Sequence, residues 1–139
     1  MPGDVPAGFA RVSLGAGFSL ELGDLFADTA RGRLGWRVGE RHVNPVGMCH
    51  GGALATFADA QLVAHYGDVE GWPAHLPTIS LSVDYLAPIP CGAWVEAEVA
   101  IDRLTRTMIF TRALITAAGS VSARSSAIYR NITRTGDPQ

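Results

Sequence analysis

The chain has 139 residues, of which 47% are hydrophobic and 17% charged, so it holds enough apolar material for one ordinary domain with a buried core. All eleven cationic residues are arginines, and the absence of lysine excludes Schiff-base chemistry and the phosphate-binding lysine of Walker-type loops. The net charge of −2 disfavours nucleic acid and acidic membrane surfaces, which attract basic proteins, and favours a small-molecule partner.

Residues 1–30 are the least regular part of the sequence, and we expect a lead-in with a short helix at 24–30 before a domain over 31–139. The lead-in has no basic stretch ahead of an apolar one, and no apolar run reaches the roughly 20 residues of a membrane span. Cys49 and Cys91 lack C-x-x-C spacing, so neither a disulfide framework nor a four-thiolate zinc site is expected. These features predict a cytoplasmic protein with no membrane partner.

A strand and a long helix are predicted at the start of the domain. Apolar residues alternate with polar or small ones from Leu34 towards Val43, as in a half-buried strand. After a turn, the segment 52–66 is rich in Ala and Leu and contains no Pro, which predicts one helix.

Four further strands are predicted by clean alternation, at 78–85, 95–102, 107–117 and 120–132. Because they are consecutive, we expect an antiparallel meander. One helix with five to six strands indicates an α+β domain in which a curved antiparallel sheet wraps around the central helix.

Asp59 is unusual because the predicted helix is apolar almost all round and carries no other formal charge before His65. Such a helix is buried by a sheet or by a second subunit. An unpaired buried carboxylate costs several kcal/mol, so Asp59 needs a partner, water or a use. It is either a structural residue bonded to a neighbouring strand, or a general base or nucleophile.

The other end of the helix opens with His50-Gly51-Gly52. Paired glycines let a ligand approach the backbone closely, while the first N–H groups of a helix lack partners within it. This arrangement suits an oxyanion or a polarised carbonyl, and a plain helix start capped at Gly51 is the alternative.

Gly51 and Asp59 are eight residues apart, so they lie roughly 12 Å apart along a helix that rises about 1.5 Å per residue. One reacting carbon cannot be reached by both, because each group must come within about 3 Å of its target. Two copies packed with antiparallel helices about a two-fold axis would bring one glycine end beside the Asp59 of the other copy. We therefore expect a homodimer at minimum.

Several motifs together resemble the hotdog-fold acyl-CoA thioesterases of the phenylacetate-degradation type, over roughly residues 30–132. They are His42-x-Asn44-x-x-Gly47-x-x-His50-Gly51-Gly52, then Asp59, then Tyr85-Leu86-x-Pro88-x-x-x-Gly92. The resemblance implies a curved sheet around one helix, assembled as dimers and often as tetramers that are dimers of dimers.

The resemblance also implies roles for single residues. The Gly51 N–H would polarise the thioester carbonyl with help from the Asn44 side chain, and Asp59 of the opposing subunit would act as base or nucleophile. A hydroxyl at the start of the next strand would hold the water, and Thr78 is expected in that place, with Ser80 as the competing choice and a further residue of the substrate site.

Other positions of the motifs are expected at the substrate site. These are His50, Gly52 and Tyr85, with His50 also weighed as a base. Coenzyme A carries phosphates, and residues 103–139 hold six arginines and one acid. Arg103 and Arg106 are the expected phosphate ligands, and Arg124 and Arg130 are alternatives.

Three other functions are alternatives to the thioesterase. A metal enzyme is disfavoured because His42, His50, Asp59 and His65 have no zinc-site spacing, and we expect no metal or cofactor. A hotdog dehydratase typically uses a His with an acid and lacks the order of Asn, His-Gly-Gly and Asp that this sequence has. A non-catalytic acyl-CoA binding or sensing module would need no base at Asp59. The acyl group stays open, with pocket depth expected to depend on Leu54, Phe57, Leu62, Tyr85 and the loop 67–77.

Overall fold

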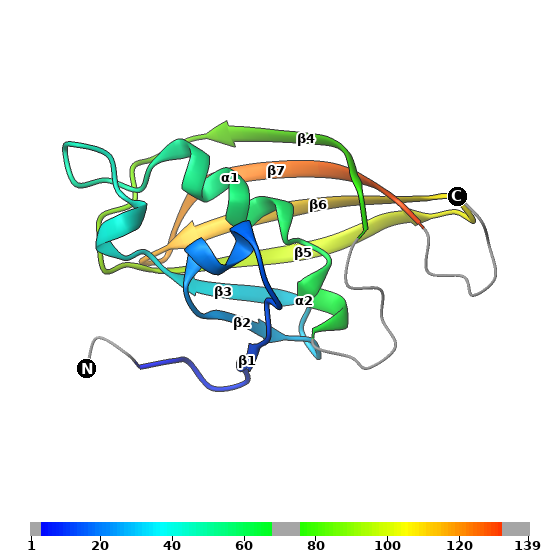
Figure 1. Ribbon diagram of the computed structural model, residues 1–139, viewed down its shortest axis with the longest axis horizontal. Coiled ribbons are helices and arrows are strands. Elements are labelled where there is room, and N and C mark those ends of the chain that lie inside the picture. The colour runs from blue at the N-terminus through cyan, green and yellow to red at the C-terminus, as the bar shows by residue number, and fades with distance from the viewer. Residues whose placement is uncertain (1–3, 68–75, 132–139) are drawn as a thin grey trace.

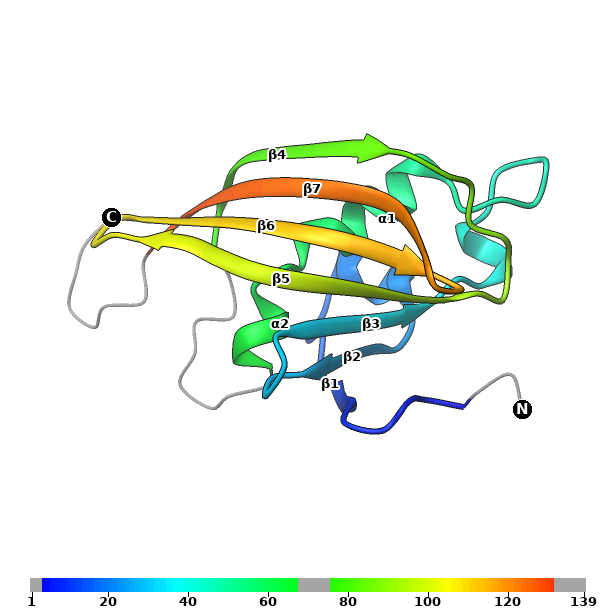
Figure 2. The same cartoon turned by 180° about the vertical axis from the view of Figure 1, so that it is seen from behind.

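The computed structural model describes residues 4–67 and 76–131, which build one curved antiparallel sheet with the helices against one of its faces (Figure 1). The opposite face carries no helix, and β5, β6 and β7 are seen directly from that side in Figure 2. In chain order the elements are β1 (Ala10–Val12), the 3-10 helix η1 (Phe18–Leu22), β2 (Leu25–Asp28), β3 (Arg33–Arg37), the 3-10 helix η2 (Glu40–His42), α1 (Gly51–Asp59), α2 (Val63–Tyr66), β4 (Thr78–Tyr85), β5 (Trp94–Leu104), β6 (Met108–Ala117) and β7 (Ser120–Arg130).

The expected curved antiparallel sheet around a central helix is confirmed, but the described chain has seven strands instead of five to six. The additional strands are β1 and β2, which pair with each other and extend the sheet beyond β3. The short helix predicted at 24–30 is therefore wrong. Leu25 and Ala27 are buried on the core side while Phe26 points the other way, which is the two-residue period of a strand.

The predicted strand from Leu34 to Val43 is shorter than expected. β3 ends at Arg37, and the chain then turns through η2, where the ring Nδ1 of His42 accepts a hydrogen bond from the Gly39 N–H at 2.8 Å. Such a local hydrogen bond from a side chain to the backbone competes with the strand-to-strand hydrogen bonds of a sheet, so the strand does not continue to Val43.

The helix predicted at 52–66 begins at Gly51 and stops at Asp59, with α2 as a separate short helix. Gln61 explains the break. Its buried amide donates to Ser125 Oγ at 2.6 Å and accepts from Thr111 Oγ1 at 2.7 Å, so it faces the sheet. The carbonyl of Asp59 accepts a hydrogen bond from the Tyr129 hydroxyl at 2.8 Å, while the Val63 N–H donates to Ala60 instead.

The strand predicted at 78–85 is confirmed with the same limits, and β5, β6 and β7 follow their predicted ranges within two residues as far as Arg130. Residue 132, the predicted end of the last strand, lies outside the described residues. β5, β6 and β7 form the expected meander, but β4 pairs with β7 and not with β5. Because β3 and β6 occupy both edges of β5, β4 cannot pair with β5, and it joins the sheet at the far side of β7.

The core lies between the sheet and one side of α1. Trp36 of β3 stacks on Phe57 of α1 with ring centroids 5.3 Å apart, and both side chains are fully buried. Leu54 and Ala58 are buried beside them. Asp59 is exposed in the single chain, so the helix is covered by its own sheet on one side only.

Candidate functional site

The first turn of α1 offers an unpaired backbone donor. His50 is the N-cap, and its ring Nδ1 accepts the Gly52 N–H at 2.8 Å. This bond occupies the Gly52 donor, and a side chain at position 52 would meet that ring at 3.0 Å. Within residues 4–67 and 76–131, the Gly51 N–H donates to nothing, as is usual for the first donors of a helix.

Tyr85, at the end of β4, holds the same helix end. Its hydroxyl donates to the Gly51 carbonyl oxygen at 2.6 Å, and a Cβ at position 51 would lie 3.4 Å from the tyrosine ring. Burial, with a smaller contribution from Cys49, raises the pKa of Tyr85, so the phenol remains a hydrogen-bond donor at neutral pH.

Asn44 lies in the loop that leads into α1. Its side-chain oxygen accepts the N–H groups of Val46 and Met48, both at 3.1 Å, which fixes the loop as a turn. The side-chain amide of Asn44 donates to none of the described residues and can serve a ligand. The neighbouring Cys49 is not an activated nucleophile, because burial raises the pKa of its thiol to about 11.

Asp59, at the last residue of α1, has one oriented and one open carboxylate oxygen. Its Oδ1 accepts a hydrogen bond from Thr78 Oγ1 at 2.8 Å. Its Oδ2 accepts none from the described part of the chain. Burial raises the pKa of Tyr129, and the Asp59 carboxylate adds to this effect, so the phenol that holds the Asp59 backbone stays protonated.

A β-bulge decides that Thr78 and not Ser80 reaches Asp59. Thr78 pairs with Tyr129 and Ser80 with Ile128, so Ile79 is an extra residue in β4. Cross-strand partners share a face of the sheet, so Thr78 lies on the helix side with Tyr129, and Ser80 lies on the opposite side with Ile128. Ile79 is 49% exposed although its place in the alternation suggested burial.

The candidate residues therefore form two groups at opposite ends of α1. Gly51 and Tyr85 mark one end, and Asp59 and Thr78 mark the other. β4 runs alongside α1 and supplies one anchoring side chain to each end (Figure 1). The separation of about 12 Å expected from the helical rise holds because α1 is regular from Gly51 to Asp59.

Arg103 and Arg106 lie at the tip of the β5–β6 hairpin, and both are exposed. Neither forms an ion pair with an acid among the described residues. The strand registers place this tip at the sheet end that carries Thr78. Of the two alternatives, Arg124 donates to Asp84 at 2.9 Å, and Arg130 also makes interactions of its own.

A cavity of about 300 Å³ opens beside Asp59. Sequence reasoning missed its walls, because Leu14, Phe18 and Leu22 come from the lead-in. Leu54 and Phe57, expected to set pocket depth, belong to the buried core instead, and residues 68–75 of the loop 67–77 lie outside the described residues. In the sequence, the scattered apolar residues of the lead-in were the one sign that it could line a pocket, and they have no clear period.

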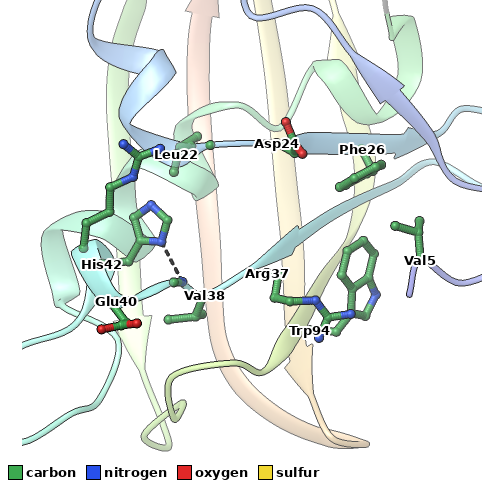
Figure 3. A pocket seen from close by; sticks show the side chains of 12 residues that line it. Val5, Leu22, Asp24, Phe26, Arg37, Val38, Glu40, His42 and Trp94 are labelled. Atoms are coloured by element: carbon green, nitrogen blue, oxygen red, sulfur yellow. Dashed lines mark hydrogen bonds between the residues drawn. The ribbon is translucent and has the colours of Figure 1, made fainter. Parts of the chain in front are cut away.

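A second hollow of about 550 Å³ lies between η2, β3 and Trp94 (Figure 3), and its lining includes none of Gly51, Tyr85, Asp59 and Thr78. Arg37 stacks on Trp94 there, with its guanidinium carbon 5.4 Å from the ring centroid, and Asp24 and Glu40 face the same space. Across the described residues, this hollow included, no three His, Cys, Asp or Glu side chains gather to hold a metal ion. No helix in this part of the molecule is long and apolar enough to cross a membrane.

The segment of the chain that contains α1 and β4 matches a known protein family. The family model described as the Thioesterase superfamily matches residues 46–123, from the loop before α1 into β7. This is more than half of the chain, and the protein belongs to the thioesterase superfamily. By sequence it is 29% identical over 93 residues to "Putative esterase PA0474" of Pseudomonas aeruginosa. The aligned residues cover 67% of this chain and 69% of that protein.

Solved structures agree on the fold. A mutant of the phenylacetic acid degradation protein PaaI from Thermus thermophilus superposes with a TM-score of 0.62 and 21% identity, over 90% of this chain and 94% of that one. A hypothetical thioesterase protein with coenzyme A from Streptococcus pneumoniae gives 0.60 and 16%, over 89% and 88%. The expected hotdog fold and the resemblance to thioesterases of the PaaI type are confirmed.

Proposed function

We propose that the protein hydrolyses acyl-CoA thioesters at a composite site made by two copies of the chain. The observation that carries this proposal is the pair of anchors on β4, where Tyr85 holds the Gly51 end of α1 and Thr78 orients Asp59 at the other end. Each end supplies one half of the chemistry, and neither half suffices alone.

The position of β4 supports a two-fold dimer. It is the last strand of the sheet, and its outer edge has no partner in the described chain. An exposed edge of eight residues is a template for pairing with another strand. Antiparallel pairing of β4 with its copy about a two-fold axis at Ser82 sets Tyr85 of one subunit opposite the bulge formed by Thr78 and Ile79 of the partner subunit. Two such dimers would form the expected homotetramer.

In this arrangement the Gly51 N–H binds the thioester carbonyl oxygen, and the Asn44 amide lies in the same loop region to assist. Asp59 of the partner subunit takes a proton from a water molecule, whose oxygen adds to the carbonyl carbon. The oxyanion is stabilised by the Gly51 N–H until the C–S bond breaks. The sulfur leaves with the electron pair and is protonated, giving free acid and coenzyme A.

Asp59 as a nucleophile is the second form of the same reaction. Its open Oδ2 would attack the carbonyl carbon, expel the thiolate and form a mixed anhydride, which water then hydrolyses. Both forms need the carboxylate oriented by Thr78.

Coenzyme A as the thiol fits the exposed arginines. Arg103 and Arg106 have no acid partners among the described residues and lie at the Asp59 end of the sheet, where the phosphates could be bound. The Streptococcus pneumoniae neighbour is a thioesterase protein with coenzyme A, which supports this choice of thiol.

The test is release of free thiol from a panel of acyl-CoAs by the wild type and by Asp59→Asn. We expect the substitution to lower kcat by about 10²- to 10⁴-fold, the usual contribution of a positioned base, with binding of a non-hydrolysable S-alkyl-CoA retained. Asp84→Asn is the matched control, since Asp84 is an exposed β4 carboxylate bound to Arg124.

Two outcomes would contradict the proposal. Unchanged turnover in Asp59→Asn removes this carboxylate from the mechanism. Tight binding of S-alkyl-CoA by a wild type that hydrolyses none of the panel identifies a non-catalytic acyl-CoA binding module.

A further inference from the structure

We infer that the cavity beside Asp59 is the acyl pocket, and that η1 makes it selective for small, uncharged, apolar acyl groups. This inference rests on the proposed function, because it assigns the acyl half of that substrate. The cavity holds about 300 Å³ and is bounded by Asp59 and Ala55 of α1, Leu81 of β4, and Phe18 and Leu22 of η1.

The wall formed by η1 is fixed at its C-terminal end. The indole N–H of Trp36 donates to the Leu22 carbonyl at 2.7 Å, and Nε2 of His42 bonds the Glu21 carbonyl at 2.7 Å. Because Nδ1 of His42 accepts the Gly39 N–H, Nε2 carries the proton and is the donor. Two buried rings therefore hold η1 against the core.

The pocket runs from an exposed rim to a buried floor. Phe18 is 73% exposed in the single chain and Leu22 is 3% exposed, while Asp59 lies on the exposed side. Gly17 and Gly23 bracket η1 with φ values of 88° and 76°, which favour glycine, so the chain turns sharply into and out of this wall. The acyl chain thus enters beside Asp59 and points towards Leu22.

The lining sets the chemical class of the acyl group. Asp59 is the only charged residue among the described ones that line the cavity, and no cation faces it. A terminal carboxylate on the acyl chain would be desolvated without a partner and repelled by Asp59. At roughly 30 Å³ per water-sized group, the volume admits an acyl group of about ten non-hydrogen atoms.

Three variants test the wall. Phe18→Ala removes the rim ring, and Leu20→Ala is its matched control, because Leu20 is an exposed apolar residue of η1 (48%) that does not line the cavity. Ala55→Leu fills the cavity from α1 with a residue of good helix propensity. Hydrolysis and binding are measured separately, with acetyl-, butyryl-, octanoyl- and succinyl-CoA and with the matching S-ethyl-, S-butyl- and S-octyl-CoA thioethers.

We expect the wild type to prefer butyryl-CoA to succinyl-CoA. Phe18→Ala should lower the octanoyl-to-acetyl ratio of kcat/KM about tenfold, through KM, because the octanoyl chain packs several methylenes past the rim ring on its way to Leu22, whereas the acetyl group offers one methyl. Ala55→Leu should lower the octanoyl-to-butyryl ratio about tenfold, and Leu20→Ala should change neither ratio. The thioether affinities should change in the same order.

The readouts separate the two proposals. Thioether selectivity that follows the variants in a protein that does not hydrolyse acyl-CoA would overturn the proposed function and uphold the pocket. Hydrolysis with ratios that Phe18→Ala and Ala55→Leu leave unchanged would overturn the pocket alone. A changed elution volume of Phe18→Ala on gel filtration, without a change in selectivity, would mean that Phe18 serves the subunit interface, and it would also overturn the pocket.

Discussion

The role proposed for Gly51 rests on a backbone group, so side-chain truncation cannot test it. Gly51 is the first helical residue after the N-cap His50, and its N–H has no acceptor in the described chain. Proline is well tolerated at this helix position and removes that donor alone. His50 has φ −64° and ψ 137°, an extended conformation of the kind that proline requires before it.

We predict that Gly51→Pro lowers kcat about 10²- to 10³-fold, the usual loss for one oxyanion donor, and changes the free energy of unfolding by less than about 1 kcal/mol. Gly51→Ala is the control. It keeps the N–H and adds a Cβ in ordinary contact with Tyr85, at 3.4 Å, so its kcat should stay close to the wild-type value. Steady-state kinetics and urea unfolding measure both, and equal losses in the two variants would exclude the backbone donor.

At the scale of single residues, the sequence alone singled out Asp59 and the His50-Gly51-Gly52 helix start because both break a local pattern. Thr78 was preferred to Ser80 through the family resemblance and not through the strand pattern. Regular alternation puts both on one face of the strand, and only the extra residue Ile79 turns Thr78 towards Asp59. A bulge depends on how two strands pair, which one strand's sequence does not encode.

The turn between α1 and α2 depends on the buried side chain of Gln61, which bridges Thr111 of β6 and Ser125 of β7. We predict that Gln61→Leu lowers the free energy of unfolding by about 2–4 kcal/mol, because two buried hydroxyls lose their partner. Urea unfolding followed by far-UV circular dichroism measures the loss.

The control for Gln61→Leu adds Thr111→Val and Ser125→Ala. Replacing all partners of a buried hydrogen bond by apolar groups is close to neutral, so the triple variant should recover most of the lost stability. A triple variant no more stable than Gln61→Leu would show that the loss comes from packing and not from the orphaned hydroxyls.

Elements with long, regular patterns were predictable, and elements defined by tertiary partners were not. β4 has its predicted limits because eight residues alternate without interruption. The helix at 52–66 splits because Gln61 finds partners on two strands that are distant in sequence. β2 has four residues, and its short pattern fits a helix turn equally well until β1 and β3 pair with it.

At the scale of the whole molecule, the sheet order leaves room for the second subunit that the proposed site needs. β4 is not part of the meander and lies at the edge of the sheet. Tyr85 and Thr78, which hold Gly51 and Asp59, therefore lie on a strand that a second copy of the chain can reach. The rise of the helix was enough to predict the separation of the two groups. The free edge of β4 could not be predicted in the same way, because the alternation of apolar and polar residues does not encode which strands become neighbours.

Complementation between two inactive variants tests the composite site directly. Gly51→Pro removes the donor and Asp59→Ala removes the carboxylate, so each homodimer lacks one group in both of its sites. In a heterodimer, one site loses both groups and the other keeps both. Random pairing of the two chains makes half of the dimers mixed, so co-expression should restore about a quarter of the wild-type sites.

The measurement is thiol release by co-expressed chains carrying two different affinity tags, with the mixed dimers purified over both. Such dimers should have about half of the wild-type kcat and an unchanged KM, since one of their two sites is intact. Co-expression of Asp59→Ala with Asp59→Asn is the control and should restore nothing. Because a site built within one chain would stay broken in every pairing, mixed dimers as inactive as their parents would show that the helix ends of two subunits do not meet.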